Sequence, residues 1–230
     1  INVLLSEDMC SVVEARGAKP KKTAIINNYA WAMSPHSTVT KSTNGPIRFV
    51  FAGNVGRFQY LEKVLRVFAQ LDPSAVELHI MGEGKAKNQL VKLTEELGCR
   101  HIHFHAHQPS EIADQFIRTC DVGLVTLAPG VYKYAFPSKV WGYMAANLRI
   151  LCLVEENSSL AKLVSEERLG ISVDPSTGET ELEKRIESFV RKIQTNRTNG
   201  ESASGKHKPE YAKQKWIELF ELLGQEALQQ

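Results

Sequence analysis

From Pro46 onward, apolar runs of strand length alternate with amphipathic stretches of helical spacing. The apolar runs predict six strands, at Ile47–Ala52, Val76–Met81, His101–Phe104, Asp121–Thr126, Arg149–Leu153 and Gly170–Val173. The stretches between them predict helices at Gln59–Leu71, Lys85–Leu97, Ser110–Thr119, Ser138–Ala146 and Ser159–Glu167. Strand–helix units that repeat in this way build a parallel sheet with helices on both faces. We therefore expect an α/β fold: a Rossmann-like, doubly wound, six-stranded parallel sheet.

The beginning of the chain does not follow this alternation. Ser6–Arg16 predicts a short helix that Gly17 ends, and a strand is expected near Thr23–Ile26. The polar residues that follow are typical of a linker between domains. We therefore expect residues 1–28 to be the tail of a preceding domain and residues 29–45 to be the linker. Because the chain opens with Ile1 rather than Met, we expect a fragment of a longer protein.

The end of the chain also departs from the pattern. Gln194–Lys208 is rich in Ser, Gly, Asn and Lys, which predicts a mobile loop. Pro209 then opens an amphipathic stretch that predicts a final helix. The main domain is therefore expected at residues 46–208 and the final helix at residues 209–230.

The composition is that of a globular protein with little charge bias. Of the 230 residues, 43% are hydrophobic and 23% are charged, and 28 Lys and Arg against 26 Asp and Glu give a formal net charge of +2. Proteins that bind nucleic acid usually carry a concentrated basic excess, so no nucleic acid is expected as a partner. A small anionic ligand in a local pocket remains compatible with this balance.

The cysteines and the apolar runs bear on the compartment. Cys10, Cys99, Cys120 and Cys152 are scattered and contain no CxxC pair, so neither a disulfide framework nor a zinc site is expected. No apolar run approaches the length of a membrane span, and no signal peptide is visible. We expect a cytoplasmic protein, with at most peripheral contact with the inner face of a membrane.

Two loops are candidates for ligand binding, because open parallel sheets bind ligands at the carboxyl ends of strands where the strand order reverses. If the six strands have the order 3-2-1-4-5-6, the loops after the first and fourth strands flank that point. The first loop, Ala52–Arg57, holds Gly53, Asn54 and Gly56, and its glycines allow the backbone to approach a phosphate closely. Arg57 adds a cation suited to phosphate. Alternatively, this is an ordinary strand-to-helix turn whose arginine faces solvent.

The second loop runs from Leu127 to Lys139 and is long for a strand-to-helix connection. Pro137, Ser138 and Lys139 then open a helix, where backbone N–H groups and the added charge of Lys139 favour an anion. Alternatively, Ser138 is only an N-cap and Lys139 only a surface residue.

Other polar positions at the same edge give weaker signals. Glu155 and Glu156 follow the fifth strand and can accept hydrogen bonds from sugar hydroxyls, or they are simply first-turn charges of the next helix. Gly82 belongs to a Gly-rich turn after the second strand, which favours a structural role, although we keep it among the candidate ligand-binding residues. His101, His103, His105 and His107 alternate with apolar residues, which predicts one polar strand face rather than a metal site.

These residues resemble those of the retaining glycosyltransferases of family 4, which have a two-domain B-type fold. The resemblance covers nearly the whole chain, and its most specific parts are Ala52–Arg57, Met81–Gly84, Phe136–Lys139, Tyr143–Ala146, Leu160–Val164 with Leu169-Gly170, Ser6–Met9 and Ile25–Asn28. It implies that the chain is the C-terminal, donor-binding domain, preceded by the end of the acceptor-binding domain. The last helix resembles the one that crosses back to pack on the first domain.

The resemblance also implies roles for the two loops. Gly53, Gly56 and Arg57 would face the diphosphate of the donor, with Ser138 and Lys139 on its other side. The base would lie near His105–Gln108. The sequence departs from the family at one place: Gly142 stands where many members carry a glutamate that binds the donor ribose, and the upstream acidic position corresponds to Tyr134.

The implied reaction moves a sugar from a UDP- or GDP-sugar to a glycan or lipid-linked acceptor. Arg57 and Lys139 would stabilise the charge on the leaving diphosphate, so no metal ion is expected. No general base is identifiable, and the acceptor side is expected in the protein's own N-terminal domain. This chain alone should then bind donor but turn over poorly.

Other interpretations remain open. A nucleotide-sugar epimerase or a phosphorylase-like enzyme would share the fold. A non-catalytic nucleotide-sugar-binding or scaffold module is favoured by Gly142. An NAD-binding domain is disfavoured, because the first loop lacks a full GxGxxG with a following acidic residue.

Overall fold

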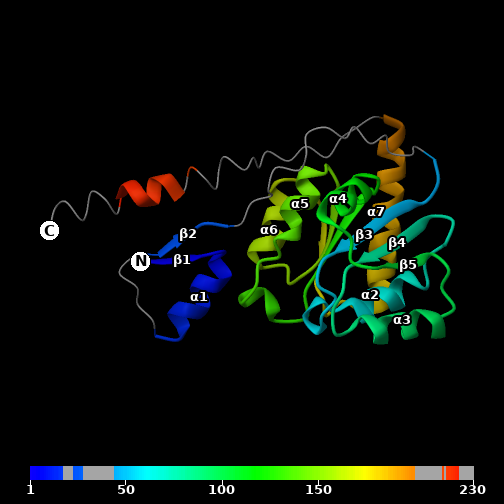
Figure 1. Cartoon of the computed structure of the whole chain (residues 1–230), viewed down its shortest axis with the longest axis horizontal. Helices are drawn as coiled ribbons and strands as arrows, with labels where there is room; N and C mark the ends of the chain where they lie inside the picture. Colours follow the sequence, from blue (N-terminus) through cyan, green and yellow to red (C-terminus); the bar gives the residue numbers. More distant parts are fainter. Residues whose placement is uncertain (18–22, 28–43, 200–213, 215, 223–230) are drawn as a thin grey trace.

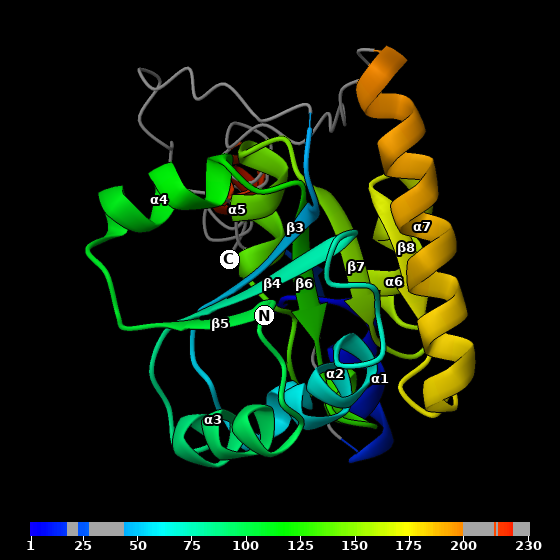
Figure 2. The same ribbon diagram turned by 90° about the vertical axis from the view of Figure 1, so that its right-hand side faces the viewer.

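A six-stranded parallel sheet forms the centre of the structure, a computed structural model that describes residues 1–17, 23–27, 44–199, 214 and 216–222. Its strands are β3 (Ile47–Ala52), β4 (Val76–Met81), β5 (Ile102–His105), β6 (Val122–Thr126), β7 (Arg149–Leu153) and β8 (Gly170–Val173). The helices around it are α2 (Leu61–Phe68), α3 (Lys87–Glu96), α4 (Ser110–Arg118), α5 (Lys139–Ala145), α6 (Ser159–Glu166) and α7 (Glu179–Asn199). Two 3₁₀ turns, η1 (Arg57–Gln59) and η2 (Val131–Lys133), lie in the loops after β3 and β6. Figures 1 and 2 show the sheet between its helices.

The strand order is β5-β4-β3-β6-β7-β8, with every neighbouring pair parallel. In the numbering of the predicted strands this is 3-2-1-4-5-6, so the expected Rossmann-like, doubly wound sheet is confirmed. The direction of winding reverses between β3 and β6. Sheets of this kind leave a crevice at the carboxyl ends of the two strands where that reversal occurs.

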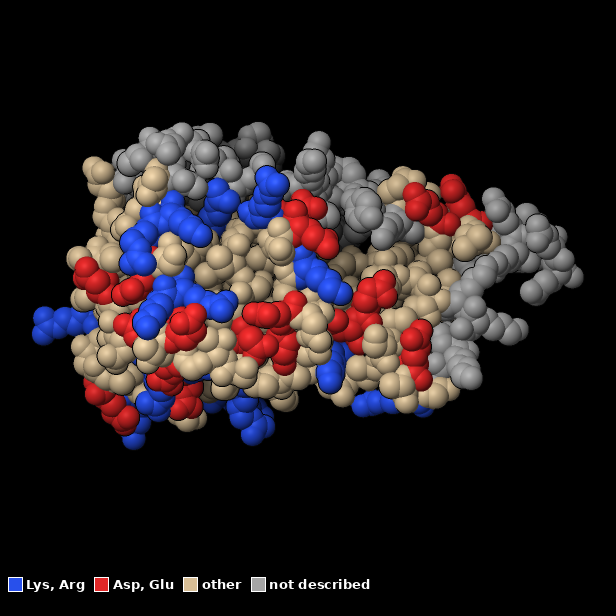
Figure 3. Space-filling model, turned by 180° about the vertical axis from the view of Figure 1, so that it is seen from behind, with Lys and Arg blue, Asp and Glu red and all other residues tan. Residues whose placement is uncertain are grey.

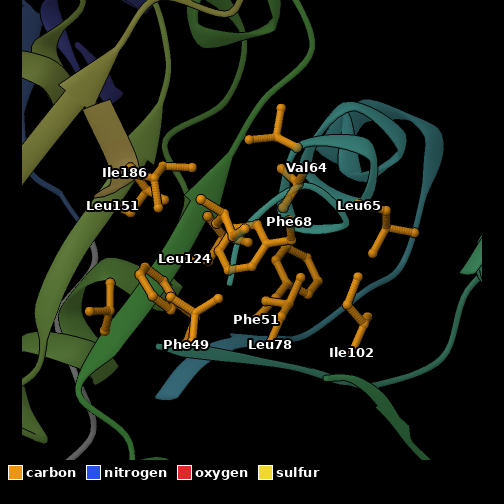
Figure 4. Close-up of a cluster of buried hydrophobic side chains, with 14 of the residues drawn as sticks. Phe49, Phe51, Val64, Leu65, Phe68, Leu78, Ile102, Leu124, Leu151 and Ile186 are labelled. Carbon is orange, nitrogen blue, oxygen red and sulfur yellow. The ribbon is translucent and has the colours of Figure 1, made fainter. Parts of the chain in front are cut away.

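Successive residues of each central strand face opposite sides of the sheet, and both sides are fully covered. Phe49 and Phe51 point to the face covered by α2, α3 and α7, and Phe49 packs edge-to-face on Phe68 of α2 with ring centroids 5.0 Å apart. Figure 4 shows this cluster closing around Phe68. Val50 points to the other face, which α4, α5 and α6 cover. Because both faces are buried at the centre of the sheet, the central strands are largely apolar, as their sequences indicated.

Helix α7 was not predicted, and it corrects the expected loop at Gln194–Lys208. Residues 194–199 belong to the helix, while residues 200–208 lie outside the described residues. The buried residues of α7 recur at helical spacing and pack on the first core cluster: Leu182, Ile186, Phe189, Val190 and Ile193. The charged residues between them hide this spacing when the stretch is judged by average composition.

A small β–α–β unit precedes the main sheet and appears in blue at one end of the molecule in Figure 1. It consists of β1 (Asn2–Leu4), α1 (Glu7–Ala15) and β2 (Thr23–Ile25), with the two strands parallel. The expected helix and second strand are confirmed, whereas β1 was not predicted. Ser6 caps α1, because its hydroxyl accepts a hydrogen bond from the N–H of Met9 at 3.3 Å.

The unit is bonded to the helices of the main domain. The Asp8 carboxylate accepts a hydrogen bond from the N–H of Ser159 at 2.9 Å, at the start of α6. The indole N–H of Trp141 on α5 donates to the side chain of Asn27 at 3.3 Å. These bonds connect the residues that were assigned to a preceding domain with the edge of the main domain. The boundaries at residues 28, 45 and 208 remain predictions.

The end of the chain is described only at residues 214 and 216–222, which are helical. Leu219 is buried, while Trp216 and Phe220 are partly or largely exposed and their rings stack 5.8 Å apart. None of the helices formed by the described residues is long and apolar enough to cross a membrane. On the face seen in Figure 3, basic and acidic side chains are interspersed.

Candidate functional site

A cavity of about 590 Å³ lies at the carboxyl ends of β3 and β6, between α4 and α5. Its volume is in the range of pockets that hold cofactor-sized ligands. Four residues predicted from sequence line it together: Gly53, Asn54, Ser138 and Lys139. The loops after β3 and β6 therefore meet across one crevice at these four residues, as expected.

Three glycines bring the loops after β3 and β4 into direct backbone contact. A Cβ on Gly82 would lie 2.0 Å from the carbonyl oxygen of Gly53, and a Cβ on Gly84 would lie 2.2 Å from that of Val55. All three glycines have φ between 133° and 159°, which side chains rarely permit. The N–H groups of Gly53 and Val55 donate to the carbonyls of Met81 and Glu83 at 2.9 and 2.8 Å. Gly82 therefore shapes the loop that lines the cavity.

A third N–H of this loop is also engaged. The N–H of Gly56 donates to the side-chain oxygen of Gln59 at 3.2 Å. Gln59 itself lines the cavity, and its carbonyl accepts a hydrogen bond from the hydroxyl of Thr126 at the end of β6. The N–H groups of Gly53, Val55 and Gly56 are therefore all bonded within the protein.

Lys139, the first residue of α5, extends along this wall. Its Cε and Nζ both lie 3.7 Å from the point where a Cβ on Gly53 would stand. Its Nζ lies 3.4 Å from the ring centroid of Phe51 and contacts the face of that ring. Among the described residues, no carboxylate forms an ion pair with Lys139. Burial lowers the pKa of this amine to about 7.

Tyr143, one turn further along α5, fixes the distance between the two loops. Its hydroxyl accepts a hydrogen bond from the N–H of Ala52, the last residue of β3, at 2.8 Å. Its ring lies where a Cβ on Gly123 of β6 would stand, 2.2 Å from the nearest ring atom. Burial raises the pKa of this hydroxyl far above its usual range, so it stays protonated. Sequence reasoning assigned no role to Tyr143, because an aromatic residue on a helix face normally indicates only core packing.

Ser138 and Gly142 complete the α5 side of the cavity. Ser138 precedes the helix, but its side chain makes no capping hydrogen bond, so the simple N-cap interpretation does not describe it. A Cβ on Gly142 would meet no atom within 4 Å. The helix therefore leaves open space in the cavity at this position.

Arg57 and Gly56 lie on the other side of the β3 loop. Both line a neighbouring cavity of about 540 Å³, together with residues of α2 and α3, and not the cavity of Lys139. Arg57 is exposed at the start of η1. The structure thus separates the two predicted cations into adjacent cavities on either side of one loop.

The two candidate carboxylates after β7 also separate. One oxygen of Glu155 accepts a hydrogen bond from the N–H of Gly130, and the other is buried without a partner among the described residues. Glu155 therefore holds the loop after β6. Glu156 is exposed and lines a different cavity between α6 and α7.

The histidines were predicted to share one strand face, and this is wrong for His101. Its Nε2 lies 2.7 Å from the carbonyl oxygen of Phe68 on α2. His101 precedes β5, which begins one residue later than predicted, so the alternation of the strand does not extend to it. His105 lies instead on the opposite face, where its Nε2 is 3.1 Å from Nδ1 of His79. His107 follows the strand and is exposed. No group of three or more His, Cys, Asp or Glu side chains in the described part of the chain is placed to hold a metal ion. A metal-independent reaction remains the prediction from sequence.

The cavity wall opposite α5 was missed by sequence reasoning. It is formed by one face of α4, with Ser110, Asp114 and Ile117. Only the spacing of these residues in an otherwise ordinary amphipathic helix could have indicated them.

The fold and this cavity define the class of the protein: a doubly wound α/β domain with a ligand cavity at its switch point. The chain belongs to the family of glycosyl transferases group 1, whose sequence pattern matches residues 36–204. It is 24% identical over 182 residues to the probable glycosyltransferase WbjE of Pseudomonas aeruginosa, covering 76% of this chain and 46% of WbjE. It is also 24% identical over 131 residues to the putative colanic acid biosynthesis glycosyl transferase WcaI of Escherichia coli (strain K12), covering 56% of this chain and 32% of WcaI. The chain therefore spans less than half the length of these curated relatives.

Comparison with solved structures agrees with this assignment of the fold. The crystal structure of Anabaena Alr3699/HepE in complex with UDP has a TM-score of 0.71 and 15% sequence identity, covering 95% of this chain and 63% of that chain. The solved neighbours are glycosyltransferases of the B-type fold. The described sheet and helices are thus the C-terminal type of domain expected from the resemblance.

Proposed function

We propose that the chain is the donor-binding part of a retaining glycosyltransferase that transfers a hexose from a nucleoside diphosphate sugar. The observation that carries this proposal is the position of Lys139. Its amine lies over Gly53 and the Phe51 ring, in a cavity at the switch point, without an ion-pair partner among the described residues. A buried cation without a counter-charge is unfavourable, and an anionic ligand removes that cost.

A diphosphate is the anion that best fits this position. The leaving diphosphate gains negative charge as the bond to the sugar breaks, and a preorganised cation stabilises that charge more in the transition state than in the ground state. In this proposal Lys139 supplies the cation, while Gly53, Asn54 and Ser138 form the adjoining wall. Arg57 approaches the same ligand from the neighbouring cavity.

The comparisons support a UDP-sugar as donor, since HepE was crystallised with UDP and also with UDP-glucose. The name of WcaI refers to colanic acid biosynthesis, which supports a glycan or lipid-linked acceptor. The residues that bind the acceptor are assigned to the part of the protein that precedes this domain. In that arrangement the β1–α1–β2 unit is the end of the acceptor-binding domain, and the protein works in the cytoplasm, in peripheral contact with a membrane.

A second function, donor binding without transfer, is favoured by one observation. Gly142 lines the cavity and leaves it open where many members of the family carry a ribose-binding glutamate. A scaffold module would retain nucleotide affinity and show no sugar transfer. A transfer assay on the full-length protein, with a radiolabelled donor, distinguishes the two functions.

Calorimetric titration with UDP, GDP and their sugars tests the donor site. The expected result is binding of at least one nucleotide, weakened about tenfold or more by Lys139→Met, because charge-assisted hydrogen bonds to phosphate are lost. Lys133→Met is the matched control, since Lys133 is exposed and outside the cavity lining. Absence of binding to every nucleotide would overturn the proposal. Equal affinity of the Lys139 and Lys133 variants for the nucleotide would show that Lys139 does not bind it.

A further inference from the structure

Helix α4 turns one face toward the cavity that holds Lys139. Ser110, Asp114 and Ile117 are three or four residues apart, so they share a face of the helix, and all three line the cavity. Ser110 is exposed, Asp114 is partly buried and Ile117 is buried. Asp114 is therefore the more buried of the two polar residues on this face.

The rotation of α4 about its own axis is fixed by contacts with the sheet. The ring of Phe116 has its centroid 5.0 Å from the rings of both His79 and His105. The guanidinium of Arg48 lies 5.2 Å from the same ring. Ile117 is buried in the second core cluster. These contacts hold α4 in one orientation before a ligand binds. The side chain of Asp114 is therefore preorganised, because α4 does not have to rotate to bring it toward the cavity.

The carboxylate of Asp114 has no bonding role within the described part of the chain. It accepts no hydrogen bond there, and it forms no ion pair with Arg118, which follows one turn later on the same helix. Burial raises the pKa of Asp114, and the charge of Arg118 lowers it to a smaller extent. The raised pKa reflects partial desolvation of the carboxylate, which the charge of Arg118 offsets only in part.

Two opposite charges therefore face the same space. Among the described residues that line the cavity, Lys139 on α5 and Asp114 on α4 are the two that carry a charge. A carboxylate repels phosphate but accepts hydrogen bonds from hydroxyls, and its two oxygens match two adjacent hydroxyl groups. A ligand that suits this cavity is anionic at one end and carries a neutral diol at the other.

We propose that Asp114 is a specificity-determining residue that accepts hydrogen bonds from a vicinal diol of the nucleoside diphosphate sugar while Lys139 holds the diphosphate. The inference rests on the proposed function and assigns a second contact in the same site. The contact to the diol comes from α4, because Gly142 on α5 offers no side chain to the ligand. The ribose and the transferred sugar both carry such a diol, and the test separates them.

The test is calorimetry on the full chain with UDP, 2′-deoxy-UDP and UDP-glucose, using Asp114→Ala and Asp114→Asn. Alanine is a better helix former than aspartate, so α4 should persist, and urea unfolding checks this. Glu111→Ala is the matched control, because Glu111 is an exposed carboxylate on the same helix that does not line the cavity. We expect Asp114→Ala to weaken binding about tenfold or more, and Asp114→Asn to weaken it less, because an amide oxygen still accepts one hydrogen bond.

The three ligands identify the diol. If the loss is seen with UDP but not with 2′-deoxy-UDP, the ribose is bound; if it is seen only with UDP-glucose, the sugar is bound. Either result supports the proposal. Affinities of Asp114→Ala equal to those of Glu111→Ala for all three ligands would overturn it, and the proposed function would stand if Lys139→Met still weakened binding. Failure of the unmodified chain to bind any of the ligands would overturn both.

Discussion

The amine of Lys139 lies 3.7 Å from the point where a Cβ on Gly53 would stand, which is an ordinary van der Waals distance. Gly53 and Lys139 are 86 residues apart in the sequence, and their contact brings the loop after β3 next to the start of α5. Gly53 is therefore needed for its backbone: its φ of 133° is one that side chains rarely adopt, whereas a Cβ would still fit beside the lysine.

Gly53→Ala tests this requirement. The substitution should lower the free energy of unfolding by about 1–3 kcal/mol, because a non-glycine residue is strained at this φ. It should also weaken UDP binding, because relief of the backbone strain would move the loop that lines the cavity. Urea unfolding and calorimetry measure the two effects.

Gly98→Ala is the control for strain alone. Gly98 follows α3 with φ 67°, and a Cβ there would meet nothing within 4 Å. It should cost about 1 kcal/mol of stability and leave the affinity for UDP unchanged. A similar loss of affinity in both variants would mean that Gly53 acts only through stability.

Tyr143→Phe tests the bond that sets the separation of the loops. The substitution leaves the ring against Gly123 but removes the acceptor for the N–H of Ala52. A buried N–H left without a partner should cost about 1–3 kcal/mol of unfolding free energy. Thermal unfolding of Tyr143→Phe beside Tyr132→Phe, a partly exposed tyrosine of η2, measures it. Equal stability of the two variants would show that the hydroxyl of Tyr143 is not a structural acceptor.

Lys139→Met should stabilise the free protein in a way that depends on pH. The pKa of Lys139 is about 7 in the fold against 10.5 in the unfolded chain, so below pH 7 the lysine is protonated in both states and the fold carries the full cost of the buried cation. The variant should gain about 2 kcal/mol at pH 6, limited by the partial exposure of the side chain. Between pH 7 and 10.5 the unfolded state binds the proton more readily, so this gain should shrink as pH rises.

Urea unfolding at pH 6 and pH 10 measures this effect, with Lys133→Met as the exposed control. A gain of the same size at both pH values would contradict a lowered pKa for Lys139. A gain of the same size in Lys133→Met would assign the effect to surface charge in general.

Most of the fold could be predicted because the central strands are buried on both faces and each predicted helix has one apolar side. β3, β4, β7 and β8 have the predicted bounds. α7 was missed because its five buried residues are separated by charged ones. β1 was missed because three residues give too short a pattern to detect.

The site residues in loops that follow strands could be predicted from the sequence. Those whose position depends on the course of a turn or on the rotation of a helix could not. Gly53 and Lys139 could be paired because parallel strands bring their carboxyl ends to one edge. The separation of Arg57 into a neighbouring cavity depends on the turn η1, which no residue in the loop signals. The contribution of Asp114 depends on the rotation of α4, which Phe116 and the histidines of β4 and β5 set.

The most direct test of the central claim, that the amine of Lys139 binds the diphosphate of the donor, is the number of protons taken up when UDP binds at pH 8. Calorimetry in buffers of different ionisation enthalpy gives this number. Because the pKa of Lys139 is about 7 in the free protein, most molecules carry a neutral amine at pH 8, and a bound diphosphate should restore the proton. We predict an uptake approaching one proton per UDP, abolished in Lys139→Arg, which stays charged throughout. UDP binding with no proton uptake, or with the same uptake in Lys139→Arg, would contradict it.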